Sequence, residues 1–221
     1  MKAVVNRYHD LCQERAFISS LLSGFFLLFT SFIIMNFAGK YASLMASNPV
    51  SDLILDNLPL HDVTVFHVNA AIIFWTIFTI YILLNPAFIP FITKSAALFI
   101  LIRCAFISMT HLGEPPNQLA IPDNFSSLVL FNGDLFFSGH VGGPFLMMLI
   151  FWSKTTLRYI CLAAAIFFAY TVLIGHIHYS IDVFAAPFIT YGIFHISQFL
   201  FASDYQRLKS ELASSSGNLQ Q

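Results

Sequence analysis

The stretch Phe17–Phe37, FISSLLSGFFLLFTSFIIMNF, runs for 21 residues without a single charged side chain. About 20 apolar residues in a helix are enough to cross the hydrocarbon core of a membrane. Charged residues make up only 10% of the whole chain of 221 residues, whereas a soluble domain contains about 25%. The sequence therefore predicts an all-α, polytopic membrane protein.

Six apolar segments are long enough, or nearly so, to be transmembrane helices: Phe17–Phe37, Phe66–Leu84, Ala96–Leu112, Ser138–Trp152, Leu157–Ile174 and Ile181–Phe201. The fourth is short, and Gly142-Gly143-Pro144 interrupts it. Such a break is tolerated at membrane depth where other helices surround it. We expect an N-terminal segment at 1–16, one six-helix membrane domain at 17–201 and a polar, disordered tail at 202–221.

The basic residues predict how the six helices are oriented, because Lys and Arg gather on the cytoplasmic side. Eight of the ten basic residues precede the first helix, lie in the second and fourth connections or follow the last helix: Lys2, Arg7, Arg15, Lys94, Lys154, Arg158, Arg207 and Lys209. All these positions fall on one side, so both termini are predicted to be cytoplasmic. The acidic residues Asp52, Asp56, Asp62, Glu114, Asp123 and Asp134 fall in loops on the opposite side.

Composition argues against several functional classes. The net charge of −1 provides no basic surface for a nucleic acid. The cysteines Cys12, Cys104 and Cys161 are scattered and show neither zinc spacing nor a disulfide pattern. We predict no metal and no cofactor, and the sequence leaves a homo-oligomer open.

Two polar motifs lie beside the apolar segments on the predicted outer side. The first is Gly133-Asp134-Leu135-Phe136-Phe137-Ser138-Gly139-His140, and 38 residues after His140 comes His178-Tyr179-Ser180-Ile181-Asp182. Residues i and i+4 share one face of a helix. Asp182 is therefore expected to orient His178 so that one ring nitrogen can attack phosphorus. His140 is expected to protonate the leaving oxygen.

Substrate-binding residues are predicted around these motifs. Ser138 and Gly139 stand at the start of a helix, where unpaired N–H groups bind anions and glycine lets a phosphate approach closely. Arg103 lies inside an apolar segment and therefore needs a partner there. Its guanidinium suits a phosphate. The alternative partner is a carboxylate, from Asp182, Asp134 or Glu114.

Three further residues are weaker candidates for substrate binding: Asp134, Glu114 and His176. His176 and His178 form a His-x-His pair that could indicate a metal, but no third ligand occurs at a suitable spacing. The remaining histidines in or near helices are expected to be interior side chains rather than catalytic ones: His67, His111 and His195.

The two motifs resemble those of the sphingomyelin synthase branch of the type 2 phosphatidic acid phosphatase superfamily. That branch has Gly-Asp-x2-Phe/Tyr-Ser-Gly-His-Thr followed by His-Tyr-Thr-x-Asp-Val. The counterparts here are Gly133–His140 and His178–Val183. Val141 replaces the threonine that follows Ser-Gly-His in the first motif. The similarity runs from about Pro49 to Phe201. It implies six transmembrane helices with the site on the exoplasmic or periplasmic face.

The resemblance also implies an activity in sphingolipid or phospholipid metabolism. It implies transfer of a phospho-alcohol from a glycerophospholipid to a lipid hydroxyl, of diacylglycerol or ceramide, through a phosphohistidine. His140 would return as the base in the second step. Two alternatives stay open: a lipid phosphate phosphatase that uses the same site with water, and a non-catalytic membrane protein that binds a lipid headgroup. The phosphatase motif Lys-x6-Arg-Pro does not occur, which favours the transferase.

Overall fold

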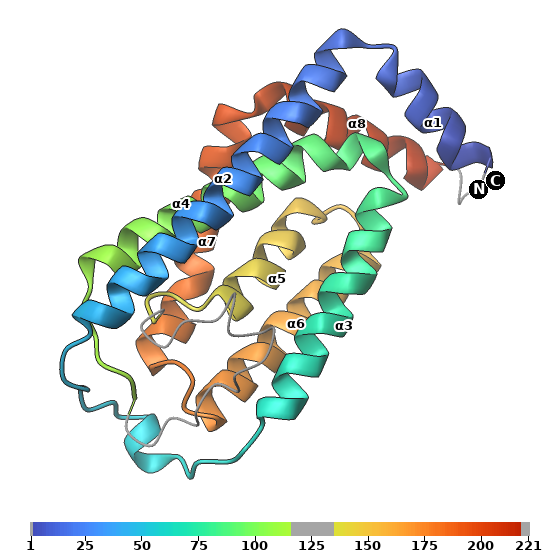
Figure 1. Ribbon diagram of the computed structural model, residues 1–221. Coiled ribbons are helices and arrows are strands. Elements are labelled where there is room, and N and C mark those ends of the chain that lie inside the picture. The colour runs from blue at the N-terminus through green and yellow to red at the C-terminus, as the bar shows by residue number, and fades with distance from the viewer. Residues whose placement is uncertain (1, 116–134, 218–221) are drawn as a thin grey trace.

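The computed structural model describes residues 2–115 and 135–217, and these form eight α-helices and two 3₁₀ turns (Figure 1). The helices are α1 (Lys2–Cys12), α2 (Arg15–Met45), α3 (Thr64–Leu83), α4 (Ile89–Met109), α5 (Gly139–Ile150), α6 (Thr155–Ile174), α7 (Ser180–Leu200) and α8 (Ala202–Gly217). The turns are η1 (Leu55–Asn57) and η2 (Pro86–Phe88). The predicted all-α class is confirmed.

Five helices are long and apolar enough to cross a membrane: α2, α3, α4 together with η2, α6 and α7. The polytopic prediction is therefore confirmed for the described residues. The expected sixth span differs, because α5 has only 12 residues. At 1.5 Å per residue it is roughly 18 Å long, well short of the ~30 Å hydrocarbon core.

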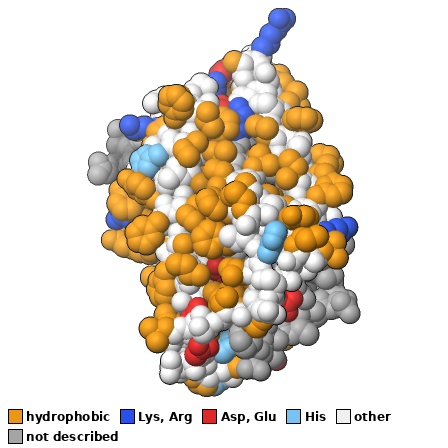
Figure 2. Space-filling view, turned by 90° about the vertical axis from the view of Figure 1, so that its left-hand side faces the viewer, with side chains coloured by type: hydrophobic (Ala, Val, Ile, Leu, Met, Phe, Trp, Pro, Cys, Tyr) orange, Lys and Arg blue, Asp and Glu red, His pale blue; other side chains and the backbone are white. Residues whose placement is uncertain are grey.

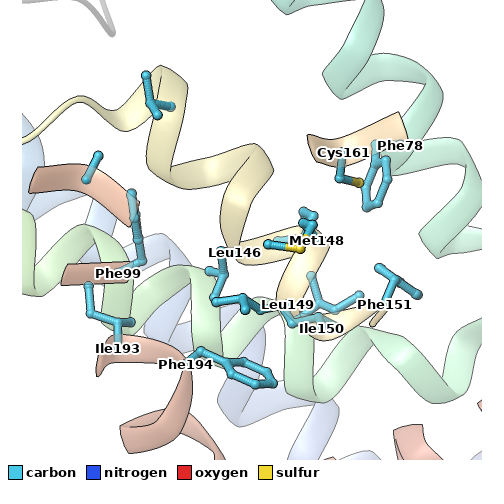
Figure 3. Packing of buried hydrophobic residues seen from close by; sticks show 14 of the residues in the cluster. Phe78, Phe99, Leu146, Met148, Leu149, Ile150, Phe151, Cys161, Ile193 and Phe194 are labelled. Atoms are coloured by element: carbon cyan, nitrogen blue, oxygen red, sulfur yellow. The ribbon is translucent and has the colours of Figure 1, made fainter. Parts of the chain in front are cut away.

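The short helix α5 forms the centre of the bundle. Its Leu146, Met148 and Ile150 belong to the main core, which also contains Phe99 of α4, Ile193 of α7 and Phe78 of α3 (Figure 3). Gly142 explains how these helices approach so closely. A Cβ atom there would lie 2.8 Å from the Phe99 ring and from Thr190 Oγ1. The glycines that interrupt the apolar pattern thus let α5 pack between its neighbours.

The outer surface of the bundle is apolar in its middle, as a lipid-facing surface must be. Figure 2 shows hydrophobic side chains covering the middle of one face, with acidic side chains gathered towards one end. The exposed apolar residues include Phe26, Phe29 and Phe37 of α2 and Phe188 and Phe199 of α7. The exposure of so many apolar side chains would be unfavourable in water, and it agrees with an integral membrane protein.

The sequence places Lys94 in a connection before the third span, and this boundary is wrong. Helix α4 begins at Ile89, and Lys94 lies buried within it. Its Nζ donates to Asp204 Oδ2 and to Ser20 Oγ, both at 2.7 Å. Because a buried lysine is stable only when paired, the ion pair fastens α8 to α4 and α2. The partner lies 110 residues away, so the local sequence could not reveal it.

The segment 202–221, predicted to be a disordered tail, is helical over Ala202–Gly217. Leu208 and Leu212 are both buried and belong to the main core. They are four residues apart and therefore share one face of α8. The Arg207 Nη2 atom also donates to Glu14 Oε2 at 2.6 Å. Polar composition hides this short apolar stripe, which is why the tail prediction failed.

Candidate active site

Several helix ends lie towards one end of the bundle, opposite to the end that carries α1 and α8 (Figure 1). They include the starts of α3, α5 and α7 and the ends of α2, α4 and α6. Both sequence motifs lie at this end, because α5 begins at Gly139 and α7 begins at Ser180. The fold therefore brings together residues that are 38 positions apart in the chain.

His178 is the best-defined side chain of the site. Its Nδ1 lies 2.9 Å from the carbonyl oxygen of Leu135 and 3.5 Å from Asp182 Oδ2. Both oxygens can only accept, so Nδ1 carries the proton and Nε2 keeps its lone pair. Only 4% of His178 is exposed. In a neutral His178, Nε2 is therefore the ring nitrogen with the lone pair.

Asp182 connects the two motifs. It is fully buried, and its Oδ2 also accepts the N–H of Tyr179 at 3.1 Å. Its backbone carbonyl accepts the N–H of Ser138 at 3.1 Å. The first turn of α7 is therefore tied to the residue that precedes α5, which holds His178 in register with the start of α5.

The start of α5 forms a cradle suited to an anion. Ser138 is the buried N-cap residue, and its hydroxyl has no hydrogen-bond partner among the described residues. Arg103 Nε donates to the carbonyl of Phe137 at 2.7 Å. A Cβ atom at Gly139 would lie 3.5 Å from the same Nε. The guanidinium, the Ser138 hydroxyl and the first N–H groups of α5 therefore gather at one place.

His140 lies on the first turn of α5 and packs against His67, which the sequence analysis predicted to be an interior residue rather than a catalytic one. Its ring and the ring of His67 are 4.4 Å apart between centroids, at an angle of 60°. Arg103 and His178 are also close enough to act electrostatically on His140. His67 is interior, as expected, but it lies in the site. Its position near the start of the span at Phe66 was the signal that could have revealed it.

Asp52, a loop residue outside the predicted site set, holds the start of α7. Its Oδ2 accepts the N–H of Ser180 at 2.7 Å, and its Oδ1 accepts the N–H groups of Ile54 and Leu55 at 2.9 and 3.1 Å. Burial of Asp52 opposes its ionisation, but these hydrogen bonds outweigh it and lower the pKa of the carboxyl. Asp52 thus acts as a remote cap for the helix that carries Asp182.

Tyr179 fastens two outer segments above the site. Its hydroxyl donates to the carbonyl of Gly113 at 2.9 Å and accepts the N–H of Val50 at 3.2 Å. Burial raises the pKa of Tyr179, and nearby carboxylates, of Asp182 first, raise it further. The phenol therefore stays neutral and keeps the proton that it donates.

The weaker candidates are placed differently. His176 Nε2 lies 3.0 Å from the carbonyl of Leu58, and its φ of 50° makes it a left-handed turn residue after α6. Among the described residues, the hydrogen-bond partners of His176 and His178 are different, Leu58 and Leu135. Glu114 is exposed and has no contact with the site among the described residues. Gly133 and Asp134 lie outside the described residues. No group of three metal-binding side chains occurs in the part of the chain that the structure describes.

Residues 132–199 match the family model described as PAP2 superfamily C-terminal. This range contains both motifs, the whole of α5 and α6 and nearly all of α7. The match supports the PAP2 superfamily, whose members are typically phosphatases or phosphotransferases, and hence an enzyme. It does not distinguish the branches of the superfamily. No curated protein and no solved structure matches the chain.

Proposed function

We propose that the protein transfers the phospho-alcohol of a glycerophospholipid to a lipid hydroxyl through a phosphohistidine at His178. The observation that carries the proposal is the position of His178 Nδ1 beside two acceptor oxygens. With Nδ1 held by Leu135 and Asp182, Nε2 is free to attack. The sphingomyelin synthase-like motif pair supports a lipid acceptor, diacylglycerol or ceramide.

In the first displacement, Nε2 of His178 attacks phosphorus and the bond to the glyceride oxygen breaks. His140, on the first turn of α5, donates the proton that this oxygen needs. Arg103 and the N–H groups at the start of α5 stabilise the charge on the phosphoryl oxygens. The Asp182 carboxylate stabilises the positive charge that develops on the His178 ring.

In the second displacement, the acceptor hydroxyl attacks the phosphohistidine and releases His178. The proton of the acceptor hydroxyl passes to a neutral histidine. The sequence motifs predict His140 for this role. Every step uses side chains of this chain, so the proposal requires neither a cofactor nor a metal. We also propose that Glu114, Asp134 and His176 contact the substrate, because all three belong to loops on the predicted outer side.

The test is the mass of the lipid products. Purified protein is incubated, with a chelator, with phosphatidylcholine, phosphatidylethanolamine and phosphatidic acid plus ceramide and diacylglycerol. A headgroup on the added acceptor, absent with His178→Ala, is the expected result. His195→Ala is the matched control, because His195 is exposed on α7 and packs edge-on against Tyr191.

The same site with water as acceptor is the second candidate, since the superfamily match fits phosphatases equally well. Free phosphate or free phospho-alcohol without a lipid product would identify that activity. Bound lipid without any turnover in the wild type would point to a non-catalytic headgroup-binding protein and contradict both enzymatic readings.

A further inference from the structure

His67, on the first turns of α3, is a third histidine in the site and has no role in the mechanism above. Its Nδ1 lies 2.9 Å from Thr171 Oγ1. That hydroxyl lies 3.1 Å from the carbonyl oxygen of Phe168, which can only accept. The single hydroxyl proton therefore goes to Phe168, and Thr171 Oγ1 accepts the proton on His67 Nδ1.

This pairing leaves Nε2 of His67 with a lone pair. The nitrogen is buried, has no hydrogen-bond partner among the described residues, and belongs to a side chain that is only 3% exposed. A buried acceptor is unfavourable when it stays unpaired. Phosphate oxygens also accept, so they cannot satisfy it. A hydroxyl group can, which fits the acceptor of the second displacement, whether a lipid alcohol or water.

We propose that His67 takes the proton of the acceptor hydroxyl in the second displacement, an inference that rests on the proposed function. The acceptor oxygen bonds to phosphorus, the phosphorus–nitrogen bond of phospho-His178 breaks, and its electron pair returns to Nε2. The hydroxyl proton passes to Nε2 of His67. His140, neutral after the first displacement, then regains this proton from the adjacent ring, so the cycle closes with no net gain or loss.

The charged groups around His67 suit a pair that holds one proton. From α5 it faces His140, with 4.4 Å between the ring centroids. From the connection between α6 and α7, His178 is close enough to act on it electrostatically. Arg103 of α4 acts on His140 in the same way. Two protonated rings this close, beside a permanent cation, repel each other. One proton can therefore move between His140 and His67, but two are disfavoured.

The experiment is a rapid-quench measurement of phosphohistidine with headgroup-labelled phospholipid. His67→Phe keeps a buried aromatic ring but removes the base. It is expected to form phospho-His178 within about 3-fold of the wild-type rate and to break it down about 100-fold more slowly. Label then accumulates on the protein. The lipid product and the free phospho-alcohol are counted separately, which tells a lipid acceptor from water.

A matched pair of variants tests the role of Thr171. Thr171→Val removes the oxygen that holds Nδ1–H and is expected to accumulate label, whereas Thr171→Ser retains the oxygen and is expected to behave as the wild type. Nitrogen-15 NMR of the labelled histidine reports the tautomer without any turnover. An unprotonated Nδ1 on His67 would overturn the inference.

Two kinetic outcomes would also overturn it. His67→Phe could slow formation and breakdown equally, as a folding defect would, or it could leave both rates unchanged. A wild-type protein that forms no phosphohistidine at all is a different result, because it refutes the proposed function on which the inference rests.

Discussion

In both His178 and His67, the partner of one ring nitrogen defines what the other nitrogen can do. For His178 the nearer partner is the carbonyl of Leu135 at 2.9 Å, and Asp182 lies at 3.5 Å. The carboxylate is therefore less a hydrogen-bond partner than a fixed negative charge. Its main effect is expected when His178 becomes positively charged on attacking phosphorus.

Asp182→Asn is expected to lower kcat by about 10²–10⁴, because it removes that charge while keeping the shape of the side chain. Lipid turnover gives kcat, and thermal unfolding shows whether the protein still folds. Asp10→Asn is the control, since Asp10 is exposed on α1. Turnover within about 3-fold of the wild type would show that Leu135 alone orients the histidine.

The sequence predicted His140, His178 and Asp182 as a cluster, and the structure places them at the same end of the bundle. Local spacing is enough for such a prediction when two residues share a helical turn. Local spacing cannot identify Leu135 or His67. Leu135 acts through its backbone carbonyl, and His67 lies on another helix, so no sequence spacing indicates either contact.

The N-terminus of α7 depends on Asp52, whose carboxylate accepts the N–H of Ser180 at 2.7 Å. Hydrogen bonds lower the pKa of Asp52 against the effect of burial. The pKa of Asp is about 3.9 in an unfolded chain. A carboxyl whose pKa is lower in the folded state stabilises the fold at pH values above that unfolded-state pKa. This contribution is lost as the pH falls through the folded-state pKa.

Asp52→Asn is therefore expected to lower the free energy of unfolding by about 1 kcal/mol at neutral pH, a typical loss for a weakened cap. Between about pH 5 and pH 3, the wild type should lose more stability than the variant. Thermal unfolding in detergent across this range measures both effects. Equal slopes in the variant and the wild type would contradict the capping role, with Asp10→Asn as the reference.

Close packing of α5 gives a second test. Gly142→Ala places a Cβ atom 2.8 Å from the Phe99 ring and Thr190 Oγ1, and it is expected to destabilise the fold by about 1–3 kcal/mol. Gly192→Ala is the matched control, because its Cβ would meet no atom of another packed element within 4 Å in the described part of the chain. It should be neutral or stabilising by up to about 1 kcal/mol. Equal unfolding temperatures for the two variants would contradict the packing of α5.

Most helices follow from apolar length alone, and their predicted bounds differ by a few residues from α3, α6 and α7. The misjudged elements depend on distant partners. Helix α4 can include Lys94 because Asp204 pairs with the charge of the lysine. Helix α8 forms because Leu208 and Leu212 pack into the core. Helix α5 has only 12 residues, and nine of them are buried inside the bundle.

The whole molecule has a polar asymmetry along its long axis. The starts of α3, α5 and α7 lie at one end, and the acidic residues Asp52, Asp56 and Asp62 belong to the connection before α3, whereas α1 and α8 lie at the other end (Figure 1). The charge pattern predicts that the second end is cytoplasmic. We therefore propose that the site opens on the exoplasmic face, or the periplasmic face if the source is bacterial.

Cysteine labelling in intact cells tests this orientation. Leu53 is 85% exposed in the outer loop, Cys12 is exposed on α1, and Cys104 and Cys161 are buried. With Cys12→Ser as background, Leu53→Cys should react with a membrane-impermeant maleimide without permeabilisation. Native Cys12 should react only after permeabilisation. The reverse pattern would place the site on the cytoplasmic face.

The proposed mechanism passes through a covalent intermediate on His178, and trapping this intermediate tests the mechanism. Purified protein is mixed with labelled phospholipid, quenched under alkaline conditions that preserve phosphohistidine, digested and sequenced by mass spectrometry. We predict a phospho-alcohol on His178 that disappears when an acceptor is added and never forms in His178→Ala. Lipid turnover in the wild type with no modified histidine, or with the modification on His140 instead, would contradict this mechanism.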